Sequence, residues 1–318
     1  MDNDTWRPRC KPPSSLVTPV PVDPAGVRGP TEGQARGPHW RRTTSGRYVP
    51  AAVPRTVEQR ILEQSVRLPP GGAVTGWAAL RLHGGGFFDG TLDGATLLDV
   101  PLVLAPGSTL RRRPGSRFTR ERLPPADVTA VHGIRVTTPA RATFDEMRAQ
   151  PDLRSAVVVL DMALAARVLT LNGFHQFLAE RAGWPGITRV RESLEHADPG
   201  SMSPQESRLR LIWVLDAGYP RPRCNVAVGD AEGRFVGTPD LLCESLAVVG
   251  EYDGAFHRAR KRHRSDVRRE AGFRQCGLET FTVVGEDLYD VPLVVARMRA
   301  AVERAAAAGL PRRWSTRR

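Results

Sequence analysis

The stretch TPDLLCESLAVVGEYDGAFH, residues 238–257, decides how the C-terminal half of the chain is expected to fold. Residues 246–252 form an apolar run that is typical of a buried strand, and residues 234–243 also have a strand-like composition. Glu244 and Ser245 suit a short turn between them. We therefore expect these two segments and a shorter strand at residues 225–228 to form an antiparallel meander.

Three acidic residues, Asp240, Glu251 and Asp253, lie within these strands or at their ends. Side chains alternate between the two faces of a strand, so Glu251 and Asp253 are expected to share a face. If the turn is Glu244–Ser245, Asp240 lies opposite Val249 and diagonal to Glu251. If the register slips by two residues, Asp240 lies directly opposite Glu251. Either register brings the carboxylates within roughly 5–8 Å of each other.

Carboxylates gathered on one patch of a sheet repel each other unless a cation lies among them. Oxygen ligands suit a hard ion such as Mg²⁺ or Mn²⁺, so the pattern favours a divalent metal site. The alternative is that Asp240, which follows Pro239, serves a turn.

A strongly basic segment follows the acidic strand. Residues 258–269, RARKRHRSDVRR, contain seven Lys or Arg residues and one acid. We interpret the segment as a helix that contacts nucleic-acid phosphates, although a solvated helix face is the alternative. The candidate contacts are Arg258, Arg260, Lys261, Arg262, Arg264, Arg268 and Arg269.

A helix is expected to begin at Ser203. Ser203 suits the N-cap, Pro204 the first helical position, and Glu206 the third position of a capping box. Glu206 is therefore either a capping residue or a further metal ligand, and the two roles are compatible. A strand at residues 278–284 and an amphipathic helix at residues 291–308 complete the C-terminal half.

The motifs PDLL (239–242), EYDGAFH (251–257) and DVRR (266–269) resemble the PD-(D/E)XK nuclease superfamily. The most similar members are endonucleases of the very-short-patch-repair type. The resemblance covers about residues 203–305, and it implies a restriction-endonuclease-like α/β domain with a central sheet flanked by helices.

This resemblance also implies roles for individual residues. Asp240 and Glu251 would bind Mg²⁺ or Mn²⁺ with help from Glu206, and His257 would be catalytic. The sequence departs from the superfamily at residue 253, where Asp253 stands in place of the expected lysine.

The N-terminal half contains helix patterns at residues 56–66, 75–83, 139–147, 153–166, 169–182 and 187–197, and strand patterns at 97–104 and 131–137. Thr56 is the expected cap of the first helix. The segments GRYVP (46–50), GWAALRLHG (76–84), GIRVTTPAR (133–141) and AVVVLD (156–161) resemble the antitoxin of abortive-infection systems. Because they are mostly apolar or turn residues, they imply a fold more than a chemistry.

Four segments and an α+β fold class follow from these patterns. We expect a basic, proline-rich, mostly irregular arm at residues 1–45 and a mixed helical and β scaffold domain at 46–200. The turn-rich residues 198–201 separate it from the nuclease-like domain at 201–309, and a basic tail occupies 310–318.

Composition narrows the function. The 318 residues contain 46 Lys and Arg against 34 Asp and Glu, a net charge of +12, which favours a polyanionic partner. Four cysteines without a close pair exclude a disulfide scaffold and a zinc finger. No apolar run approaches the ~18 residues of a membrane span and no secretory signal is visible, so we expect a cytoplasmic protein without membrane attachment.

Together these patterns predict a Mg²⁺-dependent DNA endonuclease that hydrolyses phosphodiester bonds. In this interpretation Glu206, Asp240 and Glu251 bind the metal, and Asp253 or His257 polarises the attacking water. The alternative is a nuclease-like protein without catalysis, which binds nucleic acid or regulates a toxin–antitoxin or phage-defence system. In that case its N-terminal domain would contact a protein partner.

Overall fold

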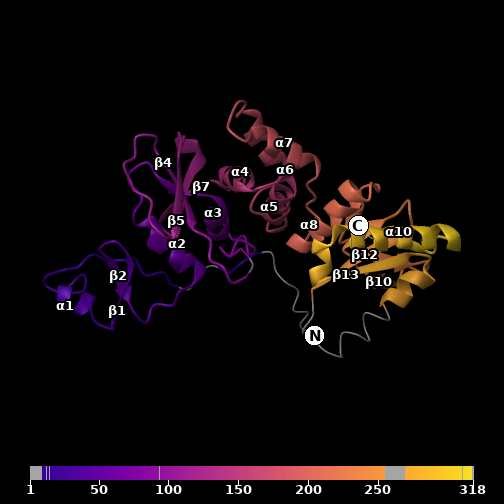
Figure 1. The fold of residues 1–318 in the computed structure, drawn as a ribbon, viewed down its shortest axis with the longest axis horizontal. Helices are drawn as coiled ribbons and strands as arrows, with labels where there is room; N and C mark the ends of the chain where they lie inside the picture. Colours follow the sequence, from indigo (N-terminus) through magenta and orange to yellow (C-terminus); the bar gives the residue numbers. More distant parts are fainter. Residues whose placement is uncertain are drawn as a thin grey trace. The chain divides into compact units, whose positions relative to one another are not determined.

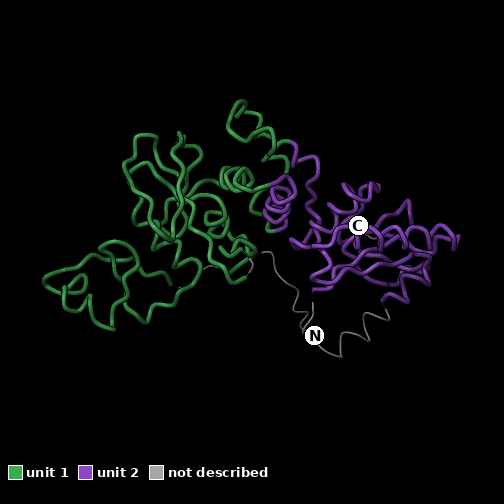
Figure 2. Tube along the Cα trace, viewed as in Figure 1, with its two compact units in different colours: residues 1–151, 166–191 green, residues 152–165, 192–318 purple. Residues whose placement is uncertain are grey.

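The computed structural model describes residues 9–11, 13, 15–92, 94–254, 269–309 and 311–316. The chain divides into two compact units (Figure 2). Unit 1 contains residues 1–151 and 166–191, and unit 2 contains residues 152–165 and 192–318. Each unit combines helices with a mixed sheet, so the predicted α+β fold class is confirmed.

Unit 1 is organised around a five-stranded sheet in the order β5-β4-β3-β7-β6 (Figure 1). Strand β4 pairs with β3 in the antiparallel and with β5 in the parallel direction. All five residues of β4 are buried, as expected for a strand covered on both faces. The strands are β3 (Ala73–Val74), β4 (Val100–Leu104), β5 (Ser116–Arg120), β6 (Val128–Val131) and β7 (Ile134–Thr137).

The helices of unit 1 begin close to the residues predicted from the sequence. Thr56 caps α2 as expected, because its hydroxyl accepts a hydrogen bond from the backbone N–H of Gln59 at 3.1 Å. The helices are α1 (Glu32–Ala35), α2 (Val57–Ser65), α3 (Gly76–Leu82), the 3₁₀ turn η1 (Pro125–Asp127), α4 (Pro139–Ala149) and α6 (Leu171–Ala179). Helix α7 (Ile187–Glu195) begins in unit 1, and its residues from Glu192 onward belong to unit 2.

Two hairpins of unit 1 were not predicted. The segment 1–45, expected to be mostly irregular, ends in β1 (Trp40–Thr44), which pairs with β2 (Arg47–Pro50) across a turn that contains Gly46. The single strand expected at 131–137 is wrong, because this segment contains the last residue of β6, a turn and the whole of β7. His132 and Gly133 both have positive φ there, the conformation of a tight two-residue turn.

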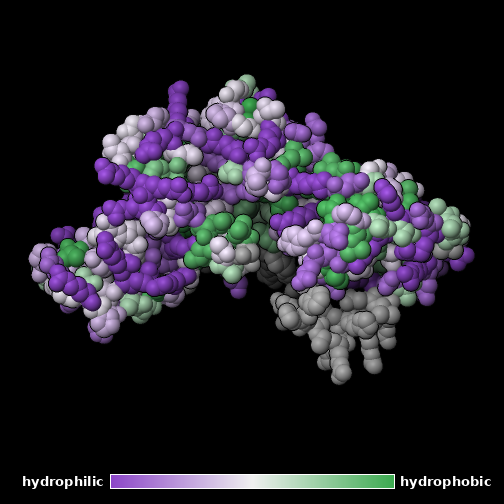
Figure 3. Space-filling model, viewed as in Figure 1, coloured by the Kyte–Doolittle hydropathy of each residue, from purple (hydrophilic) through white to green (hydrophobic). Residues whose placement is uncertain are grey.

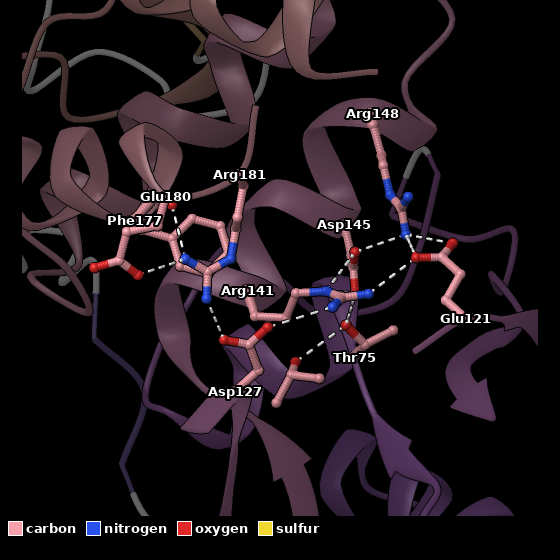
Figure 4. A network of polar contacts seen from close by, with 10 residues as sticks. Thr75, Glu121, Asp127, Arg141, Asp145, Arg148, Phe177, Glu180 and Arg181 are labelled. Carbon is pink, nitrogen blue, oxygen red and sulfur yellow. Dashed lines mark hydrogen bonds and ion pairs between the residues drawn. The ribbon is translucent and has the colours of Figure 1, made fainter. Parts of the chain in front are cut away.

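A network of buried ion pairs connects the elements of unit 1 (Figure 4). Arg141 on α4 is fully buried and contacts Glu121, Asp127 and Asp145 at 3.0, 3.4 and 2.9 Å. Arg148 contacts Glu121 at 2.6 Å and Asp145 at 2.8 Å. Because every charge has a partner of opposite sign, the network satisfies groups that would otherwise be costly to bury.

Unit 2 is built on a four-stranded sheet in the order β13-β12-β11-β8. Strands β12 and β13 are parallel, and the remaining pairs are antiparallel. The strands are β8 (Arg223–Cys224), β11 (Leu241–Cys243), β12 (Val248–Asp253) and β13 (Glu279–Val284). A second sheet has the order β10-β9-β14, with β9 (Val228–Asp230), β10 (Phe235–Gly237) and β14 (Trp314–Thr316).

Apolar side chains alternate between the two faces of the four-stranded sheet. Leu241, Cys243 and Val248 face a core that includes side chains of α8, η2 and α10, and Figure 1 shows α10 running along the sheet. Leu242 and Val249 face a second core, which contains Phe273, Cys276 and Trp314. The helices are α5 (Leu153–Ala165), α8 (Pro204–Leu211), the π-helical turn η2 (Ile212–Asp216), the 3₁₀ turn η3 (Gly285–Tyr289) and α10 (Val291–Ala308).

The strand predictions for unit 2 need three corrections. Residues 238–240 interrupt the strand expected at 234–243, so β10 and β11 lie in different sheets and the segments do not form one meander. The strand expected at 225–228 is replaced by β8, which ends at Cys224, and β9, which begins at Val228. Residues 314–316 of the expected tail form β14, which pairs with β9.

Hydrophilic residues cover most of the face drawn in Figure 3, with smaller apolar areas between them. Among the residues that the structure describes, no helix is both long and apolar enough to cross a membrane.

A buried ion pair joins α5 to α8 within unit 2. Asp161 and Arg210 are almost fully buried, and their carboxylate and guanidinium lie 2.7 Å apart. Asp161 also accepts hydrogen bonds from the Ser207 hydroxyl at 2.6 Å and the backbone N–H of Asp198 at 2.7 Å. Because α5 packs on α8, it belongs to unit 2, and the division of the chain differs from the boundary predicted near residue 200.

Asp161→Ala is expected to destabilise the protein by about 3–5 kcal/mol, because it leaves the Arg210 charge buried without its partner. The control is Asp216→Ala, which removes the more exposed Asp216–Arg154 pair and should cost no more than about 1 kcal/mol. Urea unfolding of both variants measures the difference. Equal losses of unfolding free energy in the two variants would contradict the stabilising role of the buried Asp161–Arg210 pair.

Candidate functional site

The best candidate site of unit 2 lies where β8, β11 and β12 end side by side. Leu241 pairs with Gly250 and Leu242 with Val249, so the same register places Asp240 opposite Glu251. This is the second of the two registers considered above, the one slipped by two residues. The strand pairing therefore brings together the two carboxylates that were predicted to be neighbours.

A further register extends this row across β8. Leu241 also pairs with Cys224, which places Asn225 opposite Asp240 on the other side of β11. The backbone N–H of Asn225 donates to the backbone carbonyl of Asp240 at 3.3 Å. Asn225, Asp240 and Glu251 thus lie side by side at the ends of three adjacent strands. We call the two carboxylates, Asp240 and Glu251, the acidic row.

Asp240 is half-buried between Asn225 and Glu251. Its Oδ2 accepts a hydrogen bond from the backbone N–H of Tyr252 at 2.7 Å. Burial first, and then the negative charges of Glu206 and Glu251, raise the pKa of Asp240 to about 7 against the opposing effects of the Tyr252 N–H and Arg269. Glu206 and Glu251 are therefore close enough to Asp240 to disfavour the ionisation of its carboxyl group.

Glu206 lies in the first turn of α8, where Ser203 is the N-cap and accepts from the Glu206 backbone N–H at 3.2 Å. The Glu206 carboxylate turns back as a capping residue does, but its partner differs from the expected one. Its Oε2 accepts from the backbone N–H of Met202 at 2.8 Å and from Nδ2 of Asn225 at 2.6 Å. The Glu206 side chain therefore both caps the start of α8 and lies near Asp240.

Glu251 pairs with Arg269, which lies in the helical residues 269–275. The Arg269 Nη2 donates to the Glu251 Oε2 at 2.9 Å. Arg269 was predicted to contact nucleic-acid phosphates, whereas in the structure its guanidinium contacts the acidic row. It therefore supplies a positive charge that compensates Glu251.

The remaining predicted residues have mixed outcomes. Asp253 is the last residue of β12 and is exposed, and it shares the face of Glu251 by strand alternation. His257 and most of the basic segment lie outside the described residues, so their predicted roles stay predictions. The basic residues concerned are Arg258, Arg260, Lys261, Arg262, Arg264 and Arg268.

The donor set suits a hard divalent cation, because it consists of carboxylate and amide oxygens. The hydrogen bonds within the described part of unit 2 engage Oε2 of Glu206 and Oδ2 of Asp240. Across the described ranges, however, no three His, Cys, Asp or Glu side chains are already grouped as metal ligands. A metal bound here would therefore require the side chains of Glu206, Asp240 and Glu251 to rotate toward one another.

Asn225 is a functional candidate that the sequence analysis missed. It adopts a left-handed backbone conformation with φ of 52°, which Asn tolerates better than most residues. The signal in the sequence was an Asn at the end of the proline- and arginine-rich segment PRPRCN (220–225), and this pattern is ordinarily that of a turn.

Unit 1 has a pocket of about 290 Å³ next to its ion-pair network. Thr75, Glu121, Asp145 and Arg148 line it. These groups are already engaged with each other, since Thr75 donates to Asp145 at 2.6 Å and Arg148 contacts both acids. Burial raises the pKa of Asp145 against the lowering effect of Arg141 and Arg148. The pocket is therefore a weaker candidate than the acidic row.

Comparison with known proteins gives relatives but no activity. Two proteins of Mycobacterium tuberculosis, from strains CDC 1551 / Oshkosh and ATCC 25618 / H37Rv, are each 27% identical over 217 residues. The match spans 67% of this chain and 75% of each relative, and both relatives are described as uncharacterized proteins. No protein-family model and no solved structure matches the chain. The resemblance to the nuclease superfamily therefore stays a prediction.

Asp240→Asn is expected to stabilise the protein at pH 8 and to have little effect at pH 4. The raised pKa means that the folded state holds a proton on Asp240 between about pH 4 and 7 that the unfolded state has lost. Stability therefore falls as the pH rises through this window, and Asn, which resembles the protonated form, avoids the loss. With about 1.4 kcal/mol per pKa unit, and a discount for partial exposure, the gain at pH 8 should be about 1–3 kcal/mol.

Chemical unfolding at both pH values checks this prediction. Glu244→Gln serves as a control, because Glu244 lies on the turn before β12 and pairs with Arg223 and Arg312 outside the row. If Asp240→Asn were destabilising at pH 8 by as much as at pH 4, the electrostatic description of the row would be wrong.

Proposed function

We propose that unit 2 is a metal-dependent endonuclease that hydrolyses phosphodiester bonds of DNA. The observation that supports this proposal is the strand register that puts Asp240 opposite Glu251, with Glu206 near enough to raise the pKa of Asp240. Acidic side chains gathered on neighbouring strands repel each other, and a divalent cation between them would relieve this repulsion. The resemblance of the motifs 239–242, 251–257 and 266–269 to the PD-(D/E)XK superfamily points to the same chemistry.

Asp240 and Glu251 would hold Mg²⁺ or Mn²⁺ in this proposal, and Glu206 would assist. When bound, the cation supplies stabilisation of the negative charge that develops on the phosphate oxygens. Water attacks the phosphorus, the P–O bond to the leaving nucleotide breaks, and the leaving oxygen takes up a proton. Asp253 or His257 would accept the proton of the attacking water.

The role of Arg269 in this chemistry depends on whether a cation is bound. With a cation between Asp240 and Glu251, the Arg269 guanidinium would be released to contact a DNA phosphate, as predicted for the basic segment 258–269. Without a cation, Arg269 neutralises Glu251 in place of the metal.

A second candidate function rests on the same ion pair together with Asp253. Asp253 stands where the superfamily has a lysine, and Arg269 already compensates Glu251. In this alternative unit 2 binds nucleic acid without cleaving it, and the chain regulates a toxin–antitoxin or phage-defence system with a protein partner on unit 1. The cytoplasmic location expected from the sequence stays a prediction in both cases.

Glu251→Gln is expected to abolish Mg²⁺-dependent nicking of supercoiled plasmid DNA, a loss of at least about 100-fold, because the amide cannot contribute a charged ligand. Binding of the same DNA should change by less than about threefold, as the basic segment is intact. Glu244→Gln, which changes the same residue type seven positions earlier, in the turn before β12, should nick like the parent protein.

Agarose-gel nicking and fluorescence anisotropy with and without Mg²⁺ measure these effects. Retention of full nicking by a pure Glu251→Gln sample would refute the endonuclease proposal. Salt-sensitive DNA binding by the parent protein, with no nicking in Mg²⁺ or Mn²⁺, would instead support the binding-module alternative.

A further inference from the structure

Asn225 forms hydrogen bonds with Glu206 and with Asp240, which are more contacts to acidic residues than a turn residue needs. Its side-chain Nδ2 donates to the Glu206 Oε2 at 2.6 Å and to the backbone carbonyl of Gly200 at 2.8 Å. Its backbone N–H donates to the Asp240 carbonyl at 3.3 Å. One residue therefore contacts both the helix that carries Glu206 and the strand that begins after Asp240.

The groups that hold Glu206 differ in charge from the group that holds Glu251. Glu251 is held by a guanidinium, which cancels its charge, whereas Glu206 is held by a neutral amide and a backbone N–H. Neutral donors fix the orientation of a carboxylate and leave its negative charge available to a cation. Carboxylates that bind metals are commonly oriented in this way by neighbouring hydrogen-bond donors.

The backbone conformation of Asn225 also serves this contact. Its φ of 52° follows the end of the short strand β8, and its side chain contacts Glu206 in the first turn of α8. A β-branched or bulky residue would be strained at this φ, while Asn and Gly are tolerated. Gly tolerates the backbone but lacks the amide, so the two requirements can be separated by substitution.

We propose that Asn225 is a positioning residue that holds the Glu206 carboxylate beside Asp240 for the binding of a divalent cation. This inference rests on the proposed function and adds to it a residue that the superfamily motifs quoted above do not contain. The alternative is that Asn225 is a turn residue whose side chain is incidental to the site.

The decisive variant is Asn225→Gly, which keeps the left-handed backbone accessible and removes the amide. The matched control is Ala247→Gly. Ala247 has φ of 53° in the turn before β12, so the substitution makes the same backbone change outside the acidic row. Both full-length variants should unfold within a few degrees of the parent protein, because Gly accommodates positive φ.

The first readout needs no metal. Crystal structures of metal-free parent protein and Asn225→Gly should show the Glu206 carboxylate displaced in the variant and unchanged in Ala247→Gly. A Glu206 carboxylate that keeps its place in Asn225→Gly would overturn the inference, whatever the activity of the protein.

The second readout is Mn²⁺ affinity by isothermal titration calorimetry. Asn225→Gly should bind Mn²⁺ at least about tenfold more weakly than the parent, the usual effect of removing an orienting partner, and Ala247→Gly should bind like the parent. Unchanged affinity in Asn225→Gly would overturn the inference. Absence of Mn²⁺ binding by the parent protein would overturn the proposed function and with it the cation-binding part of the inference, while the crystal structures would still decide whether Asn225 positions Glu206.

Asn225→Asp provides a second, independent test because it keeps the shape of the side chain and replaces the donor by a negative charge. The new carboxylate would repel Glu206 and should lower the melting temperature at pH 8, and added Mn²⁺ should restore a larger part of this loss than in the parent protein. A variant as stable as the parent at pH 8 without metal would contradict the contact on which the proposal rests.

Discussion

The site of unit 2 depends on how negative charge is held at the ends of two neighbouring strands. Asp240 and Glu251 face each other across β11 and β12, and Glu206 approaches from the first turn of α8. Burial and the neighbouring charges of the same sign disfavour the ionised form of Asp240, which is why its pKa rises to about 7. The fold tolerates this arrangement because Arg269 compensates Glu251 and a proton on Asp240 removes a second charge. A divalent cation would compensate both groups together.

The rest of unit 2 keeps these groups in place. The sheet is covered on both faces, by α8 and α10 on one side and by the core around Phe273 and Trp314 on the other, so the strand ends have little freedom. The buried pair of Asp161 and Arg210 fixes α8 against α5, which fixes the helix whose first turn carries Glu206. Asn225 then connects that turn to the strand row. Stability and site geometry therefore depend on the same elements.

Local features of this fold could be predicted from the sequence, and long-range features could not. Thr56 and Ser203 were recognised as helix caps because a cap is a relation between residues three positions apart. The register of β11 and β12 was left open between two choices, because the connection spans residues 244–247 and uses Ala247 at positive φ, a conformation that Ala seldom signals. The pairing of β14 with β9 and the contact of Asn225 with Glu206 join distant segments, which no short sequence pattern reveals.

The central claim is that Asp240 and Glu251 form two sides of one cation site, and a crystal of the full-length protein grown at pH 8 and soaked in MnCl₂ tests it most directly. The account predicts an anomalous-difference peak within coordination distance, roughly 2.2 Å, of carboxylate oxygens of both residues, with Glu206 turned toward the ion and Arg269 moved away from Glu251. A map without a peak there, in which the guanidinium of Arg269 still contacts Glu251, would contradict it.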